Sequence, residues 1–163
     1  MKSFKAIKSA LPVAVIGFLT LTLPSTSAFA ATATANMAVS ATVQATCAVS
    51  ATAMTFGTYT AAVSNTTSTV SVTCTNTTPY TVALNAGSAS GATVTNRSMT
   101  GPGSALLGYA LYSDAARSVN FVTTASITGN GAAQPITVYG QIPAAEYVAP
   151  GAYTDTITAT VSY

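Results

Sequence analysis

The chain contains no histidine and no tryptophan, and only 5% of its 163 residues are charged. The absence of histidine removes the side chain that most often acts as a general base or metal ligand, together with Ser–His and Cys–His nucleophile pairs. The three acidic residues, Asp114, Glu146 and Asp155, show no spacing that indicates a paired-carboxylate site, and surface acids are the simpler interpretation. The sequence therefore predicts a non-enzymatic protein without cofactor or metal.

The first thirty residues are predicted to be a secretory signal peptide. Lys2, Lys5 and Lys8 form a basic start, Leu11 to Leu23 is apolar, and Ala28-Phe29-Ala30 has the small-x-small pattern of a cleavage site. A membrane anchor is the alternative, but the apolar run is shorter than the roughly twenty residues that span a bilayer. We expect cleavage after Ala30 and export.

Charge is almost absent from the 133 residues that follow the predicted cleavage site. Two arginines, Arg97 and Arg117, stand against three acids, so the net charge of this part is −1, and the positive charge of the full chain comes from its leader. No basic patch is present, which gives nucleic-acid binding no electrostatic basis. A surface with so few charges offers little protection against self-association and suits packing against copies of the same chain.

The two cysteines, Cys47 and Cys74, can form only one intrachain disulfide, and an oxidising compartment favours it. Closing a loop of about 25 residues restricts the unfolded chain and stabilises the fold by about 3 to 4 kcal/mol. Two free thiols are the alternative.

Most of the exported part alternates apolar and polar residues with a period of two, which is typical of strands with one buried face. No segment has convincing helical periodicity, and short strands separated by turns predict a β-sandwich. Residues 64–68 are expected to form a polar turn. Strands are expected at residues 54–59, 68–75, 80–85, 92–99, 106–112, 119–123, 135–142 and 153–163.

The longest alternating run is Ala31 to Thr46, in which only Ala38 breaks the pattern. Strands usually have about five or six residues, so this run is longer than its own sheet requires. Two interpretations fit the pattern. The run is either the first strand of its own domain, or its N-terminal part adds to the sheet of another subunit.

Several motifs along the chain together resemble the spore coat protein U family of secreted pilins, the subunits of archaic-type chaperone–usher pili. The resemblance covers essentially the whole exported part, and its last two motifs are the most specific. The motifs are Cys47 close after the alternating run, Phe56-Gly57, Val72-Thr73-Cys74, Tyr112-Ser113-Asp114-Ala115-Ala116-Arg117, and the ending that starts Pro150-Gly151-Ala152-Tyr153-Thr154-Asp155.

The resemblance implies an all-β, incomplete immunoglobulin-like sandwich that lacks its last strand and is completed by a donor strand. It divides the chain into a signal peptide (1–30), an N-terminal donor segment (31–44) and a pilin domain (45–163). The donor residues that it implies are Ala35, Met37, Val39, Ala41 and Val43. Its alanines predict either shallow receiving pockets or a less tight exchange.

The same resemblance implies partners and a location. The partners would be other pilin subunits, a periplasmic chaperone and an outer-membrane usher, with export to the periplasm and then to a cell-surface fimbrium that supports attachment and biofilm formation. The chaperone would face the C-terminal strand through Ile157, Ala159, Val161 and Tyr163. The alternative function is a secreted monomeric adhesive or carbohydrate-binding β-sandwich, and the two differ in whether the donor segment pairs in trans or in cis.

Overall fold

The computed structural model describes residues 29–163, and the predicted signal peptide lies outside them except for its last two residues. No helix in this described part is long and apolar enough to cross a membrane. Residues 41–163 form one compact unit, and residues 29–40 belong to a separate one. Throughout residues 29–46 the backbone belongs to no strand and the side chains are exposed.

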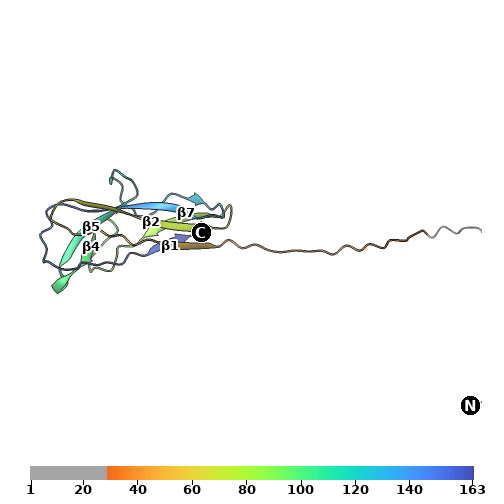
Figure 1. The fold of residues 1–163 in the computed structure, drawn as a ribbon, viewed down its shortest axis with the longest axis horizontal. Coiled ribbons are helices and arrows are strands. Elements are labelled where there is room, and N and C mark those ends of the chain that lie inside the picture. Colours follow the sequence, from red (N-terminus) through yellow and green to blue (C-terminus); the bar gives the residue numbers. More distant parts are fainter. Residues whose placement is uncertain (1–28) are drawn as a thin grey trace, which may run out of the picture. The chain divides into compact units, whose positions relative to one another are not determined.

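The compact unit contains two antiparallel sheets (Figure 1). The larger has the order β1-β2-β7-β5-β4, and the smaller has the order β6-β3-β8. A single 3₁₀ turn, η1 (Pro102–Ser104), joins two neighbouring strands. The strands are β1 (Cys47–Ala51), β2 (Ser64–Cys74), β3 (Pro79–Leu84), β4 (Arg97–Thr100), β5 (Leu106–Tyr112), β6 (Ile127–Thr128), β7 (Gln134–Ile142) and β8 (Ala159–Ser162).

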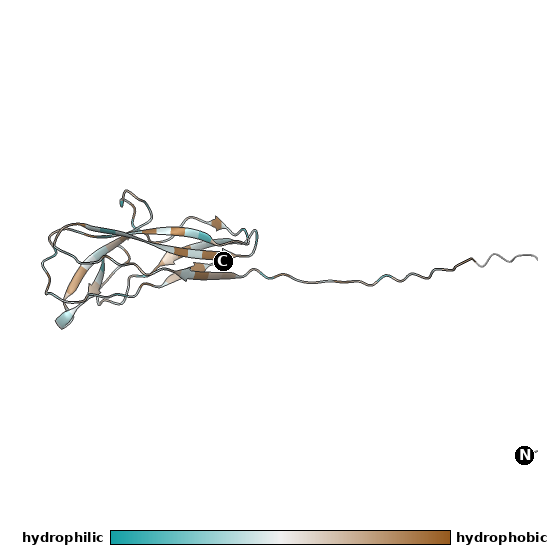
Figure 2. Cartoon of the chain, viewed as in Figure 1, coloured by the Kyte–Doolittle hydropathy of each residue, from teal (hydrophilic) through white to brown (hydrophobic). Residues whose placement is uncertain are grey.

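The core forms from the apolar rows of these strands. Apolar and polar residues alternate along them (Figure 2), so one face of each strand packs inward and the other meets solvent. Phe121 joins the cluster from a loop. The buried apolar residues on the strands are Val70, Val72, Cys74, Tyr80, Val82, Leu84, Leu107, Tyr109, Leu111, Val138 and Ile142.

The prediction of an all-β sandwich is confirmed, and the strand expected at residues 106–112 matches β5 residue for residue. The polar turn expected at residues 64–68 is wrong, because these residues continue β2. They pair with β7 from Ser64 opposite Ile142 to Ser68 opposite Val138. A neighbouring strand satisfies their backbone groups, and this outweighs the turn preference of the Ser and Asn side chains.

Four other predicted strands differ from the structure. Of the strand expected at residues 92–99 only the end is correct, because β4 covers Arg97–Thr100 and the preceding residues form a turn closed by the bridge between Thr93 and Asn96. Residues 54–59 and 119–123 belong to no strand, although Asn120 and Thr123 each form an isolated bridge. The C-terminal strand is shorter than expected: β8 covers Ala159–Ser162, so Ile157 precedes it and Tyr163 follows it. Before β8, Thr154 pairs with Thr100 at the end of β4, and the chain therefore bridges from one sheet to the other.

Candidate functional site

A continuous apolar groove opens between the chain that follows β1 and the chain that leads into β8. Its first hollow, of about 410 Å³, lies between residues 51–56 and residues 153–159. Its second hollow, of about 780 Å³, lies between residues 54–61 and residues 146–153. The hollows share Met54, Phe56, Met99 and Tyr153, so they are two parts of one groove. Core residues line its floor: Val70, Leu84, Leu111 and Val138 in the first hollow, and Leu107 and Ile142 in the second.

The walls of the groove carry backbone groups without strand partners. β1 is the first strand of its sheet and β8 the last strand of the other, so each has one neighbour. Among the described residues, no backbone–backbone hydrogen bond involves residues 53–60 of one wall or residues 155–157 of the other. Unpaired edges of this kind are templates for an added strand.

Close contacts with two glycines position the walls. Met54 and Phe56 lie where a Cβ on Gly140 of β7 would be, and the ring of Tyr153 lies where a Cβ on Gly101 would be. Any side chain at these glycines would overlap the wall residues and push them away from the sheet. Glycine at these two positions therefore allows both walls to approach the core closely.

Tyr59 ties the two walls of the second hollow together. Its hydroxyl donates a hydrogen bond to the carbonyl oxygen of Pro143 (2.5 Å) and accepts one from the backbone N–H of Glu146 (3.2 Å). The loop from Pro143 to Pro150 is thus held against the segment that follows β1. Glu146 and Asp155 line the groove, and no arginine does.

Asp155 is a polar point in the wall of the first hollow. One carboxylate oxygen accepts hydrogen bonds from the N–H of Ser88, the hydroxyl of Ser88 and the N–H of Thr156, each 2.7 Å long, and the other accepts one from the hydroxyl of Tyr109 (2.6 Å). Partial burial alone would raise the pKa of Asp155, but these hydrogen bonds to the charged form outweigh it and lower the pKa. Burial, with the carboxylate nearby, raises the pKa of Tyr109.

Arg97 lies beneath this cluster and is completely buried. Its guanidinium donates to the backbone carbonyl oxygens of Asn85 (2.9 Å), Leu84 (3.3 Å), Phe121 (3.3 Å) and Val94. Burial lowers the pKa of Arg97, and the nearby Tyr109 and Asp155 oppose that shift. Sequence reasoning missed this residue as a structural centre.

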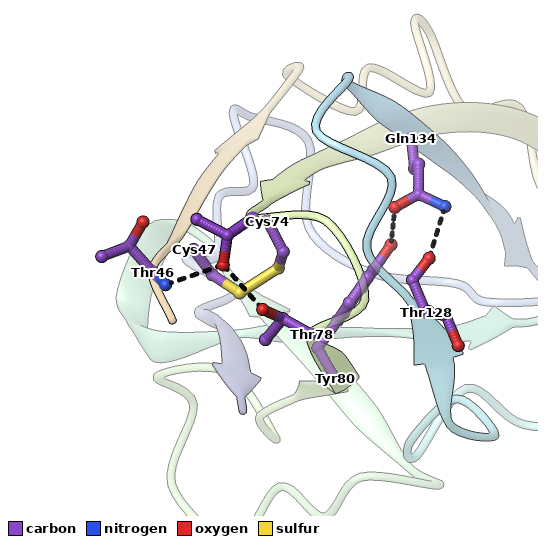
Figure 3. The surroundings of a disulfide bond; sticks show 8 residues. Thr46, Cys47, Cys74, Thr78, Tyr80, Thr128 and Gln134 are labelled. Atoms are coloured by element: carbon purple, nitrogen blue, oxygen red, sulfur yellow. Dashed lines mark hydrogen bonds between the residues drawn. A yellow bond between two sulfur atoms is a disulfide. The ribbon is translucent and has the colours of Figure 1, made fainter. Parts of the chain in front are cut away.

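The point at which the strandless residues 29–46 join β1 is firmly held (Figure 3). Cys47, the first residue of β1, forms the predicted disulfide with Cys74, its partner in the β1–β2 ladder. Hydrogen bonds extend this ladder by one residue: the N–H of Thr75 donates to the carbonyl oxygen of Thr46 (2.9 Å), and the N–H of Thr46 donates to Oγ1 of Thr75 (3.2 Å). Thr78 contacts the same Oγ1 at 2.6 Å.

The residues implied as donors are exposed, whereas most of those implied on the C-terminal strand are half-buried. Met37, Val39 and Val43 are 86%, 88% and 85% exposed, and Ala35 and Ala41 are exposed as well. On the C-terminal side, Ile157 and Ala159 line the groove, Val161 packs against the core and Tyr163 is exposed.

The Tyr112 to Arg117 motif forms a closed corner away from the groove. The carboxylate of Asp114 accepts hydrogen bonds from the N–H and hydroxyl of Ser118 and from the N–H of Val119, and these lower the pKa of Asp114. Arg117 donates to the carbonyl oxygen of Gly140 (3.3 Å) and lies 5.8 Å from the ring centroid of Tyr139. The motif shapes a loop and fixes it to β7.

The fold and groove define an all-β sandwich whose two sheets leave their edge strands open on one side. The model of the Spore Coat Protein U domain matches residues 33–160, and the chain belongs to this family. The resemblance inferred from the motifs is therefore confirmed. No curated protein matches the chain.

Among solved structures, the chain is similar to one in the chaperone–tip adhesion subunit pre-assembly complex CsuC–CsuE, from archaic chaperone–usher Csu pili of Acinetobacter baumannii. The two chains are 24% identical with a TM-score of 0.57, and the match covers 75% of this chain. It covers 41% of the length of the other chain. At this identity the likeness establishes the fold.

Proposed function

We propose that the protein is a structural subunit of a chaperone–usher pilus and that it polymerises by donor-strand complementation. The observation that carries the proposal is the groove: an apolar floor between two walls whose backbone edges are unpaired. A strand laid there would pair with both walls and cover the floor, as in strand addition to an open sheet.

The exposed N-terminal segment has the chemistry of that missing strand. Its row of Ala35, Met37, Val39, Ala41 and Val43 is apolar and is separated by polar or small residues, as a strand with one buried face requires. Each Met or Val side chain would contribute about 1.5 to 3 kcal/mol on full burial. We therefore assign residues 31–44 of one copy as the donor for the groove of the next.

The remaining partners follow from family membership. We propose that a periplasmic chaperone covers the groove before assembly, facing β8 and the residues just before it, and that an outer-membrane usher exchanges the chaperone for a donor segment. The protein would then be exported to the periplasm and reside in a cell-surface fimbrium that supports attachment and biofilm formation. The matched solved structure is of a chaperone bound to a pilus subunit, which supports this assignment.

The test compares polymers of the mature chain before and after boiling in detergent. Unboiled wild-type protein is expected to give a ladder of multimers that collapses on heating. Met37→Asp with Val39→Asp places charges on the apolar row and should abolish the ladder. The matched control, Thr34→Asp with Ser40→Asp, adds the same charges to the polar row of the same segment and should keep it.

A folded monomer that behaves identically in all three proteins would overturn the proposal. That outcome would favour the alternative, a secreted monomeric adhesive or carbohydrate-binding sandwich, for which the tyrosines Tyr59, Tyr147 and Tyr153 around the second hollow would be the first residues to examine.

A further inference from the structure

We propose that the exit point of the donor segment prevents the segment from folding back into the groove of its own chain. This inference rests on the proposed function. The exit point consists of Thr46, Cys47, Cys74 and Thr75, which hold the chain extended against the end of β2 by a disulfide and two hydrogen bonds. A segment that entered its own groove would have to reverse direction before Thr46 and return along the free edge of β1.

The register of such a hairpin limits how far the donor residues reach. The tightest reversal is a two-residue loop at Gln44 and Ala45, which sets Val43 opposite Thr46. Counting back along the antiparallel pair places Met37 opposite Thr52. Any longer loop moves Met37 back toward β1, so Thr52 is the limit of its reach.

The groove begins where that reach ends. The wall that follows β1 runs from residue 51 to residue 61, and the second hollow begins along it at residue 54. In the two-residue register, Val39 and Val43 would lie beside Ser50 and Thr46, outside both hollows. Of the apolar row, only alanines would extend past residue 53 and face the second hollow. A donor from a second copy has no such tether, so its large side chains are free to reach the groove.

The sequence also disfavours the reversal itself. Residues 42–46 read Thr-Val-Gln-Ala-Thr and contain none of the Gly, Asn, Asp or Pro residues that form tight turns. Reversing within β1 instead would break its ladder with β2 at the pair that the disulfide closes. The exit point thus keeps the segment available for another subunit and keeps the groove of its own chain open.

The test is a variant in which reversal becomes possible. Gln44→Asn with Ala45→Gly supplies a hairpin turn, and an insertion of about six alternating Thr and Ser residues after Val43 supplies the length to run beside β1. In this register Val43, Val39 and Met37 fall opposite residues 52, 56 and 58, along the groove. The matched control carries the same insertion with Gln44→Pro and Ala45→Pro, which favours an extended chain and forms no hairpin.

The melting temperature of each mature chain is measured at low concentration, with and without a synthetic peptide of residues 31–46. We expect the peptide to raise the melting temperature of the wild type and of the Pro-Pro control by at least about 5 °C, because their grooves are empty. The Asn-Gly variant should melt higher from the start, stay monomeric and no longer respond to the peptide.

Two other results have different meanings. In the first, the wild type already melts as high as the Asn-Gly variant, and its melting temperature depends neither on protein concentration nor on the peptide. If Met37→Asp with Val39→Asp then lowers this melting temperature, the donor segment of the chain occupies its own groove. That would overturn the inference and leave the groove as a strand acceptor. If the peptide stabilises none of the chains, including the Met37→Asp, Val39→Asp variant whose own donor is disabled, donor-strand complementation itself is refuted, and this inference with it.

Discussion

Replacing Arg97 with methionine should destabilise the sandwich more than any other single change to a charged residue. The side chain is completely buried, and its guanidinium donates to four backbone carbonyl oxygens from three different segments of the chain. Methionine fills much of the same volume but donates nothing, so all four acceptors lose their partner.

The size of the effect follows from where those acceptors lie. The hydrogen bonds to Leu84 and Phe121 are buried, and those to Asn85 and Val94 are partly buried, so water can replace the guanidinium only at the last two. Leaving a buried polar group unpaired costs about 1 to 3 kcal/mol, and removing one partner of a buried charge network costs about 3 to 5 kcal/mol. Relief from burying a cation offsets part of this, and we expect a net loss of about 3 to 5 kcal/mol.

Urea unfolding of the mature chain, followed by circular dichroism, measures this loss as a change of midpoint at an unchanged slope. Arg117→Met is the matched control, because Arg117 is half-buried at a loop and donates to Gly140 and Ala115 near the surface. Its variant should lose less than about 1 kcal/mol. If Arg97→Met were no less stable than Arg117→Met, the assignment of Arg97 as the centre that joins these segments would be refuted.

Three further predictions concern the surroundings of the groove. The pKa of Asp155 is lower in the folded chain than in the unfolded chain, so its contribution to stability is present above the unfolded value of about 4 and is lost as the pH falls through the lower folded value. The urea midpoint should therefore fall in acid, and Asp155→Asn should reduce this pH dependence. Gly87→Ala should lower the free energy of unfolding by about 1 to 3 kcal/mol, because φ is +89° and the new Cβ would overlap the Asp155 carboxylate. Gly91→Ala is the control for backbone strain alone, since φ is +77° there and the new Cβ would meet open space. A larger loss at Gly91 than at Gly87 in urea unfolding would contradict the overlap. Residues 29–163 contain no lysine and only a buried Arg97 and a half-buried Arg117, so the native mature chain should survive trypsin that cleaves it in urea, and native cleavage at Arg97 on a gel would contradict the burial.

The sequence predicted most of the strands that have a neighbour on both sides and an apolar row facing the core, although the first five residues of β2 were expected to be a turn. For β5 and β7, alternation alone located the strand, because burial of Leu107, Leu111 and Val138 decides both the period and the face. The disulfide was also predictable, because the two cysteines allow only one intrachain pair. β1 was missed as a separate strand, since its residues are small and mostly exposed and its position depends on pairing with β2.

The candidate site was harder to predict because it is defined by missing pairings. Residues 54–59 have the composition of a strand, and Met54 and Phe56 do pack against the core, but no neighbouring strand pairs with their backbone. Sequence patterns report which side chains are buried and carry no signal for an absent neighbour. Arg97 left only a weak signal: it shares the parity of Met99 in the strand expected at residues 92–99, but a charged residue in such a strand gives no indication of complete burial.

The chain contains both an unpaired strand-like segment and a groove that lacks a strand. Residues 31–46 alternate as regularly as any strand of the core, yet they belong to neither sheet, and Met37, Val39 and Val43 stay exposed. The groove lacks a strand of this kind: its floor is apolar, and the backbones of its two walls have no strand partner. Because Ala35 and Ala41 bury little surface, the side-chain contribution of a donor made of this segment would come largely from Met37, Val39 and Val43. Substitutions at the alanines that preserve a strand should therefore matter less to assembly than the spacing of Met37, Val39 and Val43.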